Sequence, residues 1–205
     1  MDNTANISLE AEMIFEYQVN ELMMHTGDLI CTTDGGGADI RGQFWRLLGK
    51  LIPGDVDHIV VYLGPEGRCI EAGPLGVSTF EISGGIWDSE KMAEQRGQLI
   101  DELYGVAYPL QGKDLTDAQI AHMREDIANY CLAQIGKPYN IDFLDPYREN
   151  AFYCSQLAYK AYLREGIDLN TRIGIPNIPG TESIIFPQEI WSGCAHCRAE
   201  VEGNS

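Results

Sequence analysis

The chain has 205 residues, enough for one compact domain with a sizeable core but short for two full domains. Its 14 basic residues against 31 acidic ones give a formal net charge of −17. A surface of this charge repels phosphate backbones and anionic membranes, so binding to nucleic acid is disfavoured.

The sequence has no apolar run long enough to cross a bilayer. Residues 1–12 have neither the basic start nor the apolar core of a signal peptide. We therefore expect a cytoplasmic protein without a transmembrane segment. Six cysteines scattered through a chain of this size favour free thiols over a disulfide framework.

The N-terminal part begins with apolar side chains at nearly helical spacing, which predict an amphipathic helix over residues 8–24. A short strand over 27–31 is expected next. It is followed by a glycine-rich loop over 34–42 and a short helix over 44–48. The loop lacks the Gly-Lys-Ser or Gly-Lys-Thr that a phosphate-binding loop requires.

A β-hairpin is predicted in the next segment. β-Branched and aromatic residues fill 57–63, a Gly-Pro-Glu-Gly turn follows, and 68–72 forms the returning strand. Residues 77–82 are predicted to form another strand, and residues 88–95 are predicted to form a short helix. The pattern over 98–106 fits helix and strand equally well.

Two long helices are predicted in the second half. The first spans 117–135, with Thr116 as its N-cap and Gly136 as its stop. The second covers 153–165. The Pro- and Gly-rich segment 170–187 must wrap the surface or cover a cleft. Strands early in the chain and helices later predict a single α+β domain.

Cys154 lies in the sequence Phe-Tyr-Cys-Ser-Gln-Leu, at the first turn of the second long helix. A helix N-terminus carries partial positive charge and unpaired N–H groups, which favour a thiolate and can bind an oxyanion. Cys131 is expected within a helix, and Cys31 and Cys69 within strands, where a cysteine acts as a small apolar residue. Cys154 is the candidate nucleophile, and a buried structural cysteine is the alternative.

A nucleophilic cysteine needs a base, and the chain has four histidines. His58 begins an apolar strand, from whose end it can project rigidly over a cleft. His122 falls within a predicted helix, His25 at a helix-to-strand junction and His196 near the C-terminus. His58 is therefore the candidate base, and a structural histidine at the sheet edge is the alternative.

Glu71 is the candidate for the group that orients the imidazole and holds its tautomer. His58 and Glu71 lie at equal distances from the turn between their strands, so we expect them to be near cross-strand partners. The alternative is a solvent-facing glutamate on an edge strand.

Five segments follow the order found in the permuted papain-like cysteine hydrolases: Gly-Asp-Leu-Ile at 27–30, His-Ile-Val-Val-Tyr-Leu-Gly at 58–64, Ile-Glu-Ala at 70–72, Gly-Lys-Pro-Tyr at 136–139 and Phe-Tyr-Cys-Ser-Gln-Leu at 152–157. The chain resembles this family, which includes YiiX-like proteins. The family is related to the NlpC-type cell-wall peptidases and to the lecithin–retinol acyltransferases.

The resemblance implies a circularly permuted papain-like fold, in which a small antiparallel β-barrel or sheet packs against helices and the histidine precedes the cysteine. It implies one domain over residues 1–205 with a shared core over about 26–167. The helix over 8–24 and the tail over 170–205 are then additions. The valines of 58–64, where relatives often have a glycine, depart from the family pattern.

The resemblance implies site residues as well. Cys154 is the nucleophile, His58 the base and Glu71 the orienting residue, which agrees with the assignment from the residues themselves. It also implies that Tyr139 lines the active site, with its hydroxyl near the oxyanion or the substrate backbone. Without the resemblance, Tyr139 reads as a core tyrosine beside a proline turn.

Cys194 and Cys197 have C-x-x-C spacing with His196 between them. A zinc site of this type needs a second pair, which the sequence lacks. We expect neither a metal nor a cofactor, and we interpret the two cysteines as free thiols near the C-terminus.

The expected function is hydrolysis of an amide bond through an acyl-enzyme. The resemblance implies a small peptide or an amino-acid conjugate as substrate, such as a cell-wall fragment. The acidic chain would suit a cationic group such as lysine or diaminopimelate. The alternatives are acyl transfer or lipid-ester cleavage, which would need a hydrophobic groove, and a catalytically silent binding module.

Overall fold

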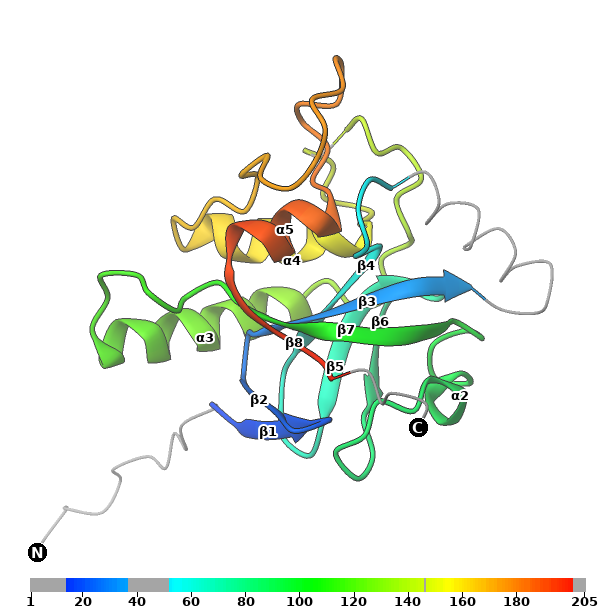
Figure 1. Cartoon of the computed structure of the whole chain (residues 1–205), viewed down its shortest axis with the longest axis vertical. Coiled ribbons are helices and arrows are strands. Elements are labelled where there is room, and N and C mark those ends of the chain that lie inside the picture. The colour runs from blue at the N-terminus through cyan, green and yellow to red at the C-terminus, as the bar shows by residue number, and fades with distance from the viewer. Residues whose placement is uncertain (1–13, 37–51, 146, 201–205) are drawn as a thin grey trace, which may run out of the picture.

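The computed structural model describes residues 14–36, 52–145 and 147–200 (Figure 1). Eight strands lie within these ranges: β1 (Glu16–Val19), β2 (Leu22–His25), β3 (Leu29–Gly36), β4 (His58–Tyr62), β5 (Arg68–Gly73), β6 (Gly76–Glu81), β7 (Ile100–Tyr108) and β8 (Ala195–Arg198). The same ranges contain the helices α2 (Ser89–Met92), α3 (Asp117–Leu132), α4 (Cys154–Arg164) and α5 (Pro187–Gly193).

Six strands form one antiparallel sheet in the order β6-β5-β4-β3-β7-β8, and β1 and β2 form a separate hairpin. Among the described strands the sheet is open, because β6 and β8 lie at its two edges and no ladder joins them. The expected sheet packed against helices is therefore confirmed. Closure into a small barrel is not seen in the described residues.

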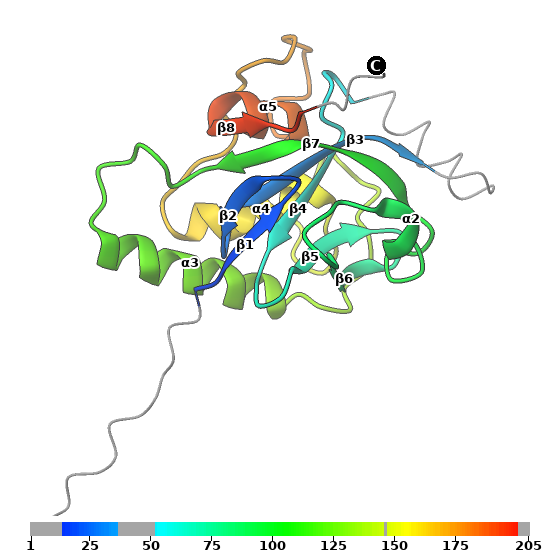
Figure 2. The ribbon, with the colours of Figure 1, turned by 60° about the horizontal axis from the view of Figure 1, so that its bottom comes forward.

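Both faces of the sheet are buried, and different elements cover them (Figure 2). On one face, Ile59 and Ile70 pack with the apolar sides of α3, α4 and α5. On the other, Val60 and Cys69 pack with the β1–β2 hairpin and with Met92 of α2. Burial on both sides explains why β4 reads as a continuous apolar run rather than an alternating one.

The helix predicted over 8–24 is wrong for its described part, because residues 16–25 form the β1–β2 hairpin. Asn20 and Glu21 make its two-residue turn with left-handed φ angles of 42° and 65°. This turn geometry matches the twist of paired strands and lets Val19 and Met24 reach the core together. Residues 8–13 lie outside the described part of the chain.

The other predicted elements have mixed outcomes. The strand over 27–31 continues as β3 through Gly36, into the segment expected to be a loop, and the helix over 44–48 lies outside the described residues. The ambiguous segment 98–106 is strand β7, and the two long helices are α3 and α4. Beyond residue 186 the tail contains α5 and β8, which were not predicted.

Helices α3 and α4 are both tied to the turn that precedes β3. Arg124 of α3 donates from Nη1 to the Thr26 carbonyl at 2.6 Å and to Asp28 Oδ1 at 2.8 Å. Tyr162 of α4 donates its hydroxyl to the Gly27 carbonyl at 2.6 Å. Because Asp28 is fully buried, the Arg124 guanidinium compensates a charge that water cannot reach.

None of the helices in the described ranges combines the length and the apolar composition needed to span a membrane.

We predict that Arg124→Ala lowers the free energy of unfolding by about 3–5 kcal/mol, because it leaves the Asp28 carboxylate buried and unpaired. Urea denaturation of the two proteins measures this difference. His122→Ala is the matched control on the same helix, since the His122 side chain is 73% exposed, and we expect a change within about 0.5 kcal/mol. Equal losses in the two variants would contradict the anchoring role of Arg124.

Candidate active site

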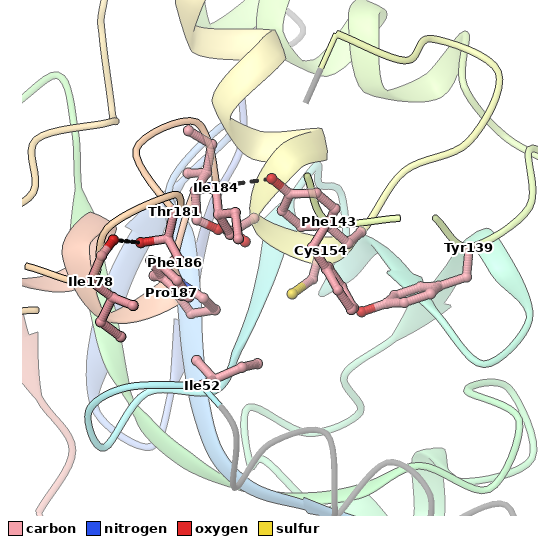
Figure 3. Close-up of a pocket in the computed structure, with 12 residues that line it drawn as sticks. Ile52, Tyr139, Phe143, Cys154, Ile178, Thr181, Ile184, Phe186 and Pro187 are labelled. Carbon is pink, nitrogen blue, oxygen red and sulfur yellow. Dashed lines mark hydrogen bonds between the residues drawn. The ribbon is translucent and has the colours of Figure 1, made fainter. Parts of the chain in front are cut away.

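Cys154 is the first residue of α4, and its thiol is nearly buried, with 5% of the residue exposed. Gln156 fixes this end of the helix, because its Oε1 accepts from the Tyr153 backbone N–H at 3.2 Å. The sulfur points into a pocket (Figure 3). The thiol therefore lies where the helix N-terminus offers partial positive charge and unpaired N–H groups.

His58 is the first residue of β4, and it lies near enough to Cys154 for that residue to raise the pKa of its imidazole. Its Nε2 lies 2.7 Å from Glu71 Oε2. Because Glu71 occupies Nε2, Nδ1 is the ring nitrogen left for another partner. The structure thus brings together three of the residues that the sequence singled out, in the order thiol, imidazole and carboxylate.

The register of the β4–β5 hairpin differs from the predicted one. Val61 pairs with Ile70, so the ladder continued to His58 would reach Gly73 rather than Glu71. Glu71 is therefore a diagonal neighbour of His58, because it lies two residues from Gly73, the position that faces His58, and on the same face of the sheet. A side chain at Gly73 would begin 3.3 Å from Glu71 Oε1, so this glycine leaves room for the carboxylate.

Arg96 also binds Glu71 and shares its Oε2 with His58. Its Nε donates to Glu71 Oε1 at 3.1 Å, and its Nη2 donates to Oε2 at 2.8 Å. This two-pronged contact fixes the plane of the carboxylate. Arg96 itself is fully buried, and its guanidinium stacks near the rings of Phe80 and Trp87 at 4.7 and 5.0 Å from their centroids.

Asp101 binds the other side of the same guanidinium, at 2.7 Å from Nη1 and 2.8 Å from Nη2. Its two oxygens also accept hydrogen bonds from Thr32 on β3, from Ser89 on α2 and from the indole of Trp87. Through Arg96 and Asp101, the Glu71 carboxylate is thereby connected to β3, α2 and Trp87 by buried, paired groups. In such a network the position of the Glu71 side chain is more restricted than that of a glutamate in solvent.

The charges in this network shift the protonation of its members. Burial would raise the pKa of Glu71, but Arg96 and then His58 outweigh burial and lower that pKa to about 2. Burial would lower the pKa of His58, but Cys154 and then Glu71 raise it well above its ordinary value. The arrangement favours a carboxylate at Glu71 and an imidazolium at His58.

Tyr139 lies beside the thiol, on the segment that leads to α4. A bridge between Tyr139 and Phe152 holds the segment, and Asn140 donates from Nδ2 to Gln156 Oε1 at 3.2 Å. Burial, and after it the neighbouring Cys154, raise the pKa of Tyr139 well above its ordinary value. The phenol therefore keeps its proton and remains a potential hydrogen-bond donor.

A pocket with a volume of about 230 Å³ opens beside Cys154 (Figure 3). Its walls come from the Tyr139 segment, the start of α4 and the chain before α5. The twelve described residues that line it are Ile52, Tyr139, Phe143, Tyr153, Cys154, Ser155, Ile178, Thr181, Ile184, Ile185, Phe186 and Pro187. The Pro- and Gly-rich tail therefore covers a cleft, one of the two roles expected of it.

The sequence analysis missed Arg96 and Asp101. Arg96 stands in the sequence Ala-Glu-Gln-Arg-Gly, whose polar residues are typical of a solvated turn, and Asp101 falls in the segment that could not be assigned. A charged residue between a predicted short helix and a strand gives no signal of full burial. Only the folded arrangement brings them behind His58.

Cys194 lies between α5 and β8, and Cys197 lies within β8 and is exposed. Within the described part of the chain, no cluster of three or more His, Cys, Asp or Glu side chains could hold a metal ion. The described residues therefore give the C-x-x-C spacing no metal-binding role.

The model of one protein family matches residues 43–175, and that family is described as a permuted papain-like amidase enzyme, YaeF/YiiX, C92 family. The match covers more than half of the chain and includes His58, Glu71, Tyr139 and Cys154. Neither a search of curated proteins nor a search of solved structures gives a match.

Because the pKa of Glu71 is lowered in the folded protein, the free energy of unfolding decreases at acidic pH. The contribution of Glu71 is complete above the unfolded value of 4.5 and is lost as the pH falls toward 2, which amounts to about 3 kcal/mol of unfolding free energy. We predict that Glu71→Gln removes this part of the decline between pH 5 and 2, as measured by denaturation at each pH. Glu81→Gln, at an exposed position on β6, is the control that keeps the wild-type decline. An unchanged decline in Glu71→Gln would show that Glu71 is not held as a buried carboxylate.

Proposed function

The chain belongs to the permuted papain-like amidase family, and from this premise we propose that it hydrolyses an amide bond with Cys154 as nucleophile, His58 as base and Glu71 as orienting residue. The observation that carries the assignment is the continuous set of contacts from thiol to imidazole to buried carboxylate at a helix N-terminus. Nucleophile, base and orienting residue are also the three roles in other enzymes in which a cysteine or serine acts with a histidine.

In the first half of the proposed reaction, the Cys154 proton moves to His58, and the sulfur attacks the carbonyl carbon. A C–S bond forms, and negative charge develops on the carbonyl oxygen. Backbone N–H groups at the start of α4, together with the Tyr139 hydroxyl, would stabilise this charge. The C–N bond then breaks, and the imidazolium gives its proton to the departing amine.

In the second half, water replaces the amine beside His58. The imidazole takes one proton of the water, the oxygen attacks the thioester carbon, and the C–S bond breaks. The products are a carboxylic acid and the regenerated Cys154–His58 pair. Glu71, held by Arg96, keeps the same ring nitrogen directed at the sulfur through both halves.

For the substrate we propose a small peptide or an amino-acid conjugate, in line with the kinship to cell-wall peptidases. The net charge of −17 would favour approach of a cationic amine. A lysine or diaminopimelate group is one such partner.

Acyl transfer is a second candidate, and the apolar pocket beside the thiol favours it. An acyltransferase needs an apolar site for the acyl group, and nearly all side chains around this pocket are apolar or aromatic. Transfer would share the first half-reaction and differ only in the acceptor, with an amine or alcohol in place of water.

The amidase proposal predicts that iodoacetamide alkylates Cys154 at pH 6, where a thiol of ordinary pKa near 8.5 reacts slowly. We expect His58→Ala to reduce the rate at pH 6 by about 100-fold, because the imidazole no longer takes the proton. Mass spectrometry of the labelled peptide gives the rate for Cys154 alone.

His122→Ala is the matched control, since this exposed histidine does not contact the thiol. The exposed thiol of Cys197 serves as an internal standard in every sample. Equal Cys154 rates in all three proteins would remove the support for a thiol–imidazole pair and leave a binding module as the remaining explanation.

Product analysis distinguishes the two possible fates of the acyl-enzyme, which are hydrolysis and acyl transfer. We predict that an N-acyl amide incubated with the protein in H₂¹⁸O and 10 mM hydroxylamine gives mainly the ¹⁸O-labelled acid, since hydrolysis is the proposed fate. Cys154→Ser is expected to lower both products by at least about 100-fold. A product consisting mainly of the hydroxamate would favour acyl transfer over hydrolysis.

A further inference from the structure

A second pocket lies away from the candidate active site. It has a volume of about 490 Å³, and its walls come from β2, the turn before β3, the end of β7 and α3. The turn leads into Leu29 at one end of the β3–β4 ladder, whereas His58 lies at the other end. Among the described residues, none lines both this pocket and the one beside Cys154. The two pockets are therefore separate.

Arg124 of α3 brings unused hydrogen-bond donors to this second pocket. Its Nη1 donates to the Thr26 carbonyl at 2.6 Å and to Asp28 Oδ1 at 2.8 Å. All three nitrogens of a guanidinium carry N–H donors, but no described residue accepts from Nε or Nη2. Neither of these nitrogens is fully enclosed by protein. Because the Arg124 side chain is only 11% exposed and lines the pocket, its unpaired edge faces the cavity.

The carboxylate of Asp28, which also lines the pocket, has no comparable capacity left. Its side chain has no exposed surface, and Oδ1 accepts from Arg124. Oδ2 accepts from the His25 backbone N–H at 2.8 Å. A cation in the pocket would therefore reach no oxygen of this carboxylate, whereas an anion would pair the remaining donors of Arg124.

The geometry of the unpaired edge matches a carboxylate. Nε and Nη2 point two parallel N–H groups in one direction, and a carboxylate accepts both at once. Arg96 binds Glu71 in this way, with Nε donating to Oε1 and Nη2 to Oε2. The same two nitrogens of Arg124 are available for a carboxylate that comes from outside the described chain.

The rest of the lining suits an organic body on that carboxylate. Met23, Leu110 and Ile120 contribute apolar surface, and Gln111 adds an exposed amide. A cavity of roughly 150 Å³ accommodates benzene. The volume of about 490 Å³ thus leaves room for a six-membered ring beside the carboxylate.

We infer that this pocket binds a small organic carboxylate through Nε and Nη2 of Arg124, with the apolar part of the ligand against Met23 and Ile120. The ligand needs none of the groups proposed for amide hydrolysis, so the site goes beyond that function. The net charge of −17 opposes an anion at a distance. Salt at about 0.15 M screens such repulsion beyond about 8 Å, whereas the contact with Arg124 acts at hydrogen-bond distance.

Titration calorimetry of the full chain with phenylacetate and with 2-phenylethanol tests the inference. The two compounds share a ring and a short chain and differ in the charged group. Neither contains an amide bond, so the wild-type protein can be used. We expect phenylacetate to bind at least about tenfold more tightly, because only the carboxylate accepts from both nitrogens with its full charge.

Two substitutions of Met23 place the binding in this pocket. Met23 lines it and is 46% exposed, so we expect both variants to fold, which circular dichroism checks. Met23→Glu puts a negative charge beside the bound anion, and Met23→Gln is the uncharged control of the same shape. We expect Met23→Glu to bind phenylacetate about tenfold more weakly than Met23→Gln, with no difference for 2-phenylethanol.

Backbone amide chemical shifts of the ¹⁵N-labelled protein show which pocket the ligand enters. Changes on adding phenylacetate that cluster at Met23 and Gln111 support the inference. Changes confined to Cys154 and Ser155 would assign the binding to the other pocket and overturn it. Equal affinities for the two compounds, equal phenylacetate affinities of Met23→Glu and Met23→Gln, or no binding of phenylacetate would also overturn it. A failure of amide hydrolysis leaves all of these measurements unchanged.

Discussion

The arrangement of the site depends on one buried guanidinium that binds two carboxylates. Arg96 has no exposed surface, and it contacts Glu71 with one edge and Asp101 with the other. Two buried carboxylates and one guanidinium leave a net negative charge, which would be costly in an environment that excludes water. The imidazolium of His58 supplies the second positive charge, so the same contacts that stabilise the interior also favour the protonated state that a thiolate partner requires.

The arrangement of the sheet explains why His58, the proposed base, lies at a strand end. The hairpin and α2 pack on one face of the sheet, and α4 packs on the other. By strand alternation, His58 shares the face of Val60, away from α4. It reaches Cys154 because it is the first residue of β4, beyond the paired positions of the β4–β5 ladder. A histidine in the middle of the strand would be separated from the thiol by the sheet itself.

The sequence predicted the parts of the site that depend on local signals. A helix start at Cys154 follows from the apolar pattern after it, and two strands around a glycine-rich turn bring His58 near Glu71. The predicted register was shifted by two residues. The contact still forms, because a shift of two keeps both side chains on one face and a glutamate can reach its diagonal neighbour. Arg96 and Asp101 could not be predicted, since full burial of a charge depends on partners distant in the chain. The N-terminal hairpin was mistaken for a helix because apolar residues on either side of a two-residue turn imitate helical spacing.

The acidity of the chain and the apolar character of the pocket are compatible once the two sides of the scissile bond are considered separately. Cys154, the proposed nucleophile, borders the apolar pocket on one side and lies near His58, the proposed base, on the other. Charge on the protein surface acts over a distance set by ionic strength, about 10 Å at 0.1 M salt, and so influences approach from solvent. Contacts inside the pocket act on a substrate only after water has been expelled from it. Surface charge would therefore favour the approach of a cationic amine, whereas the pocket offers a mainly apolar surface beside the thiol.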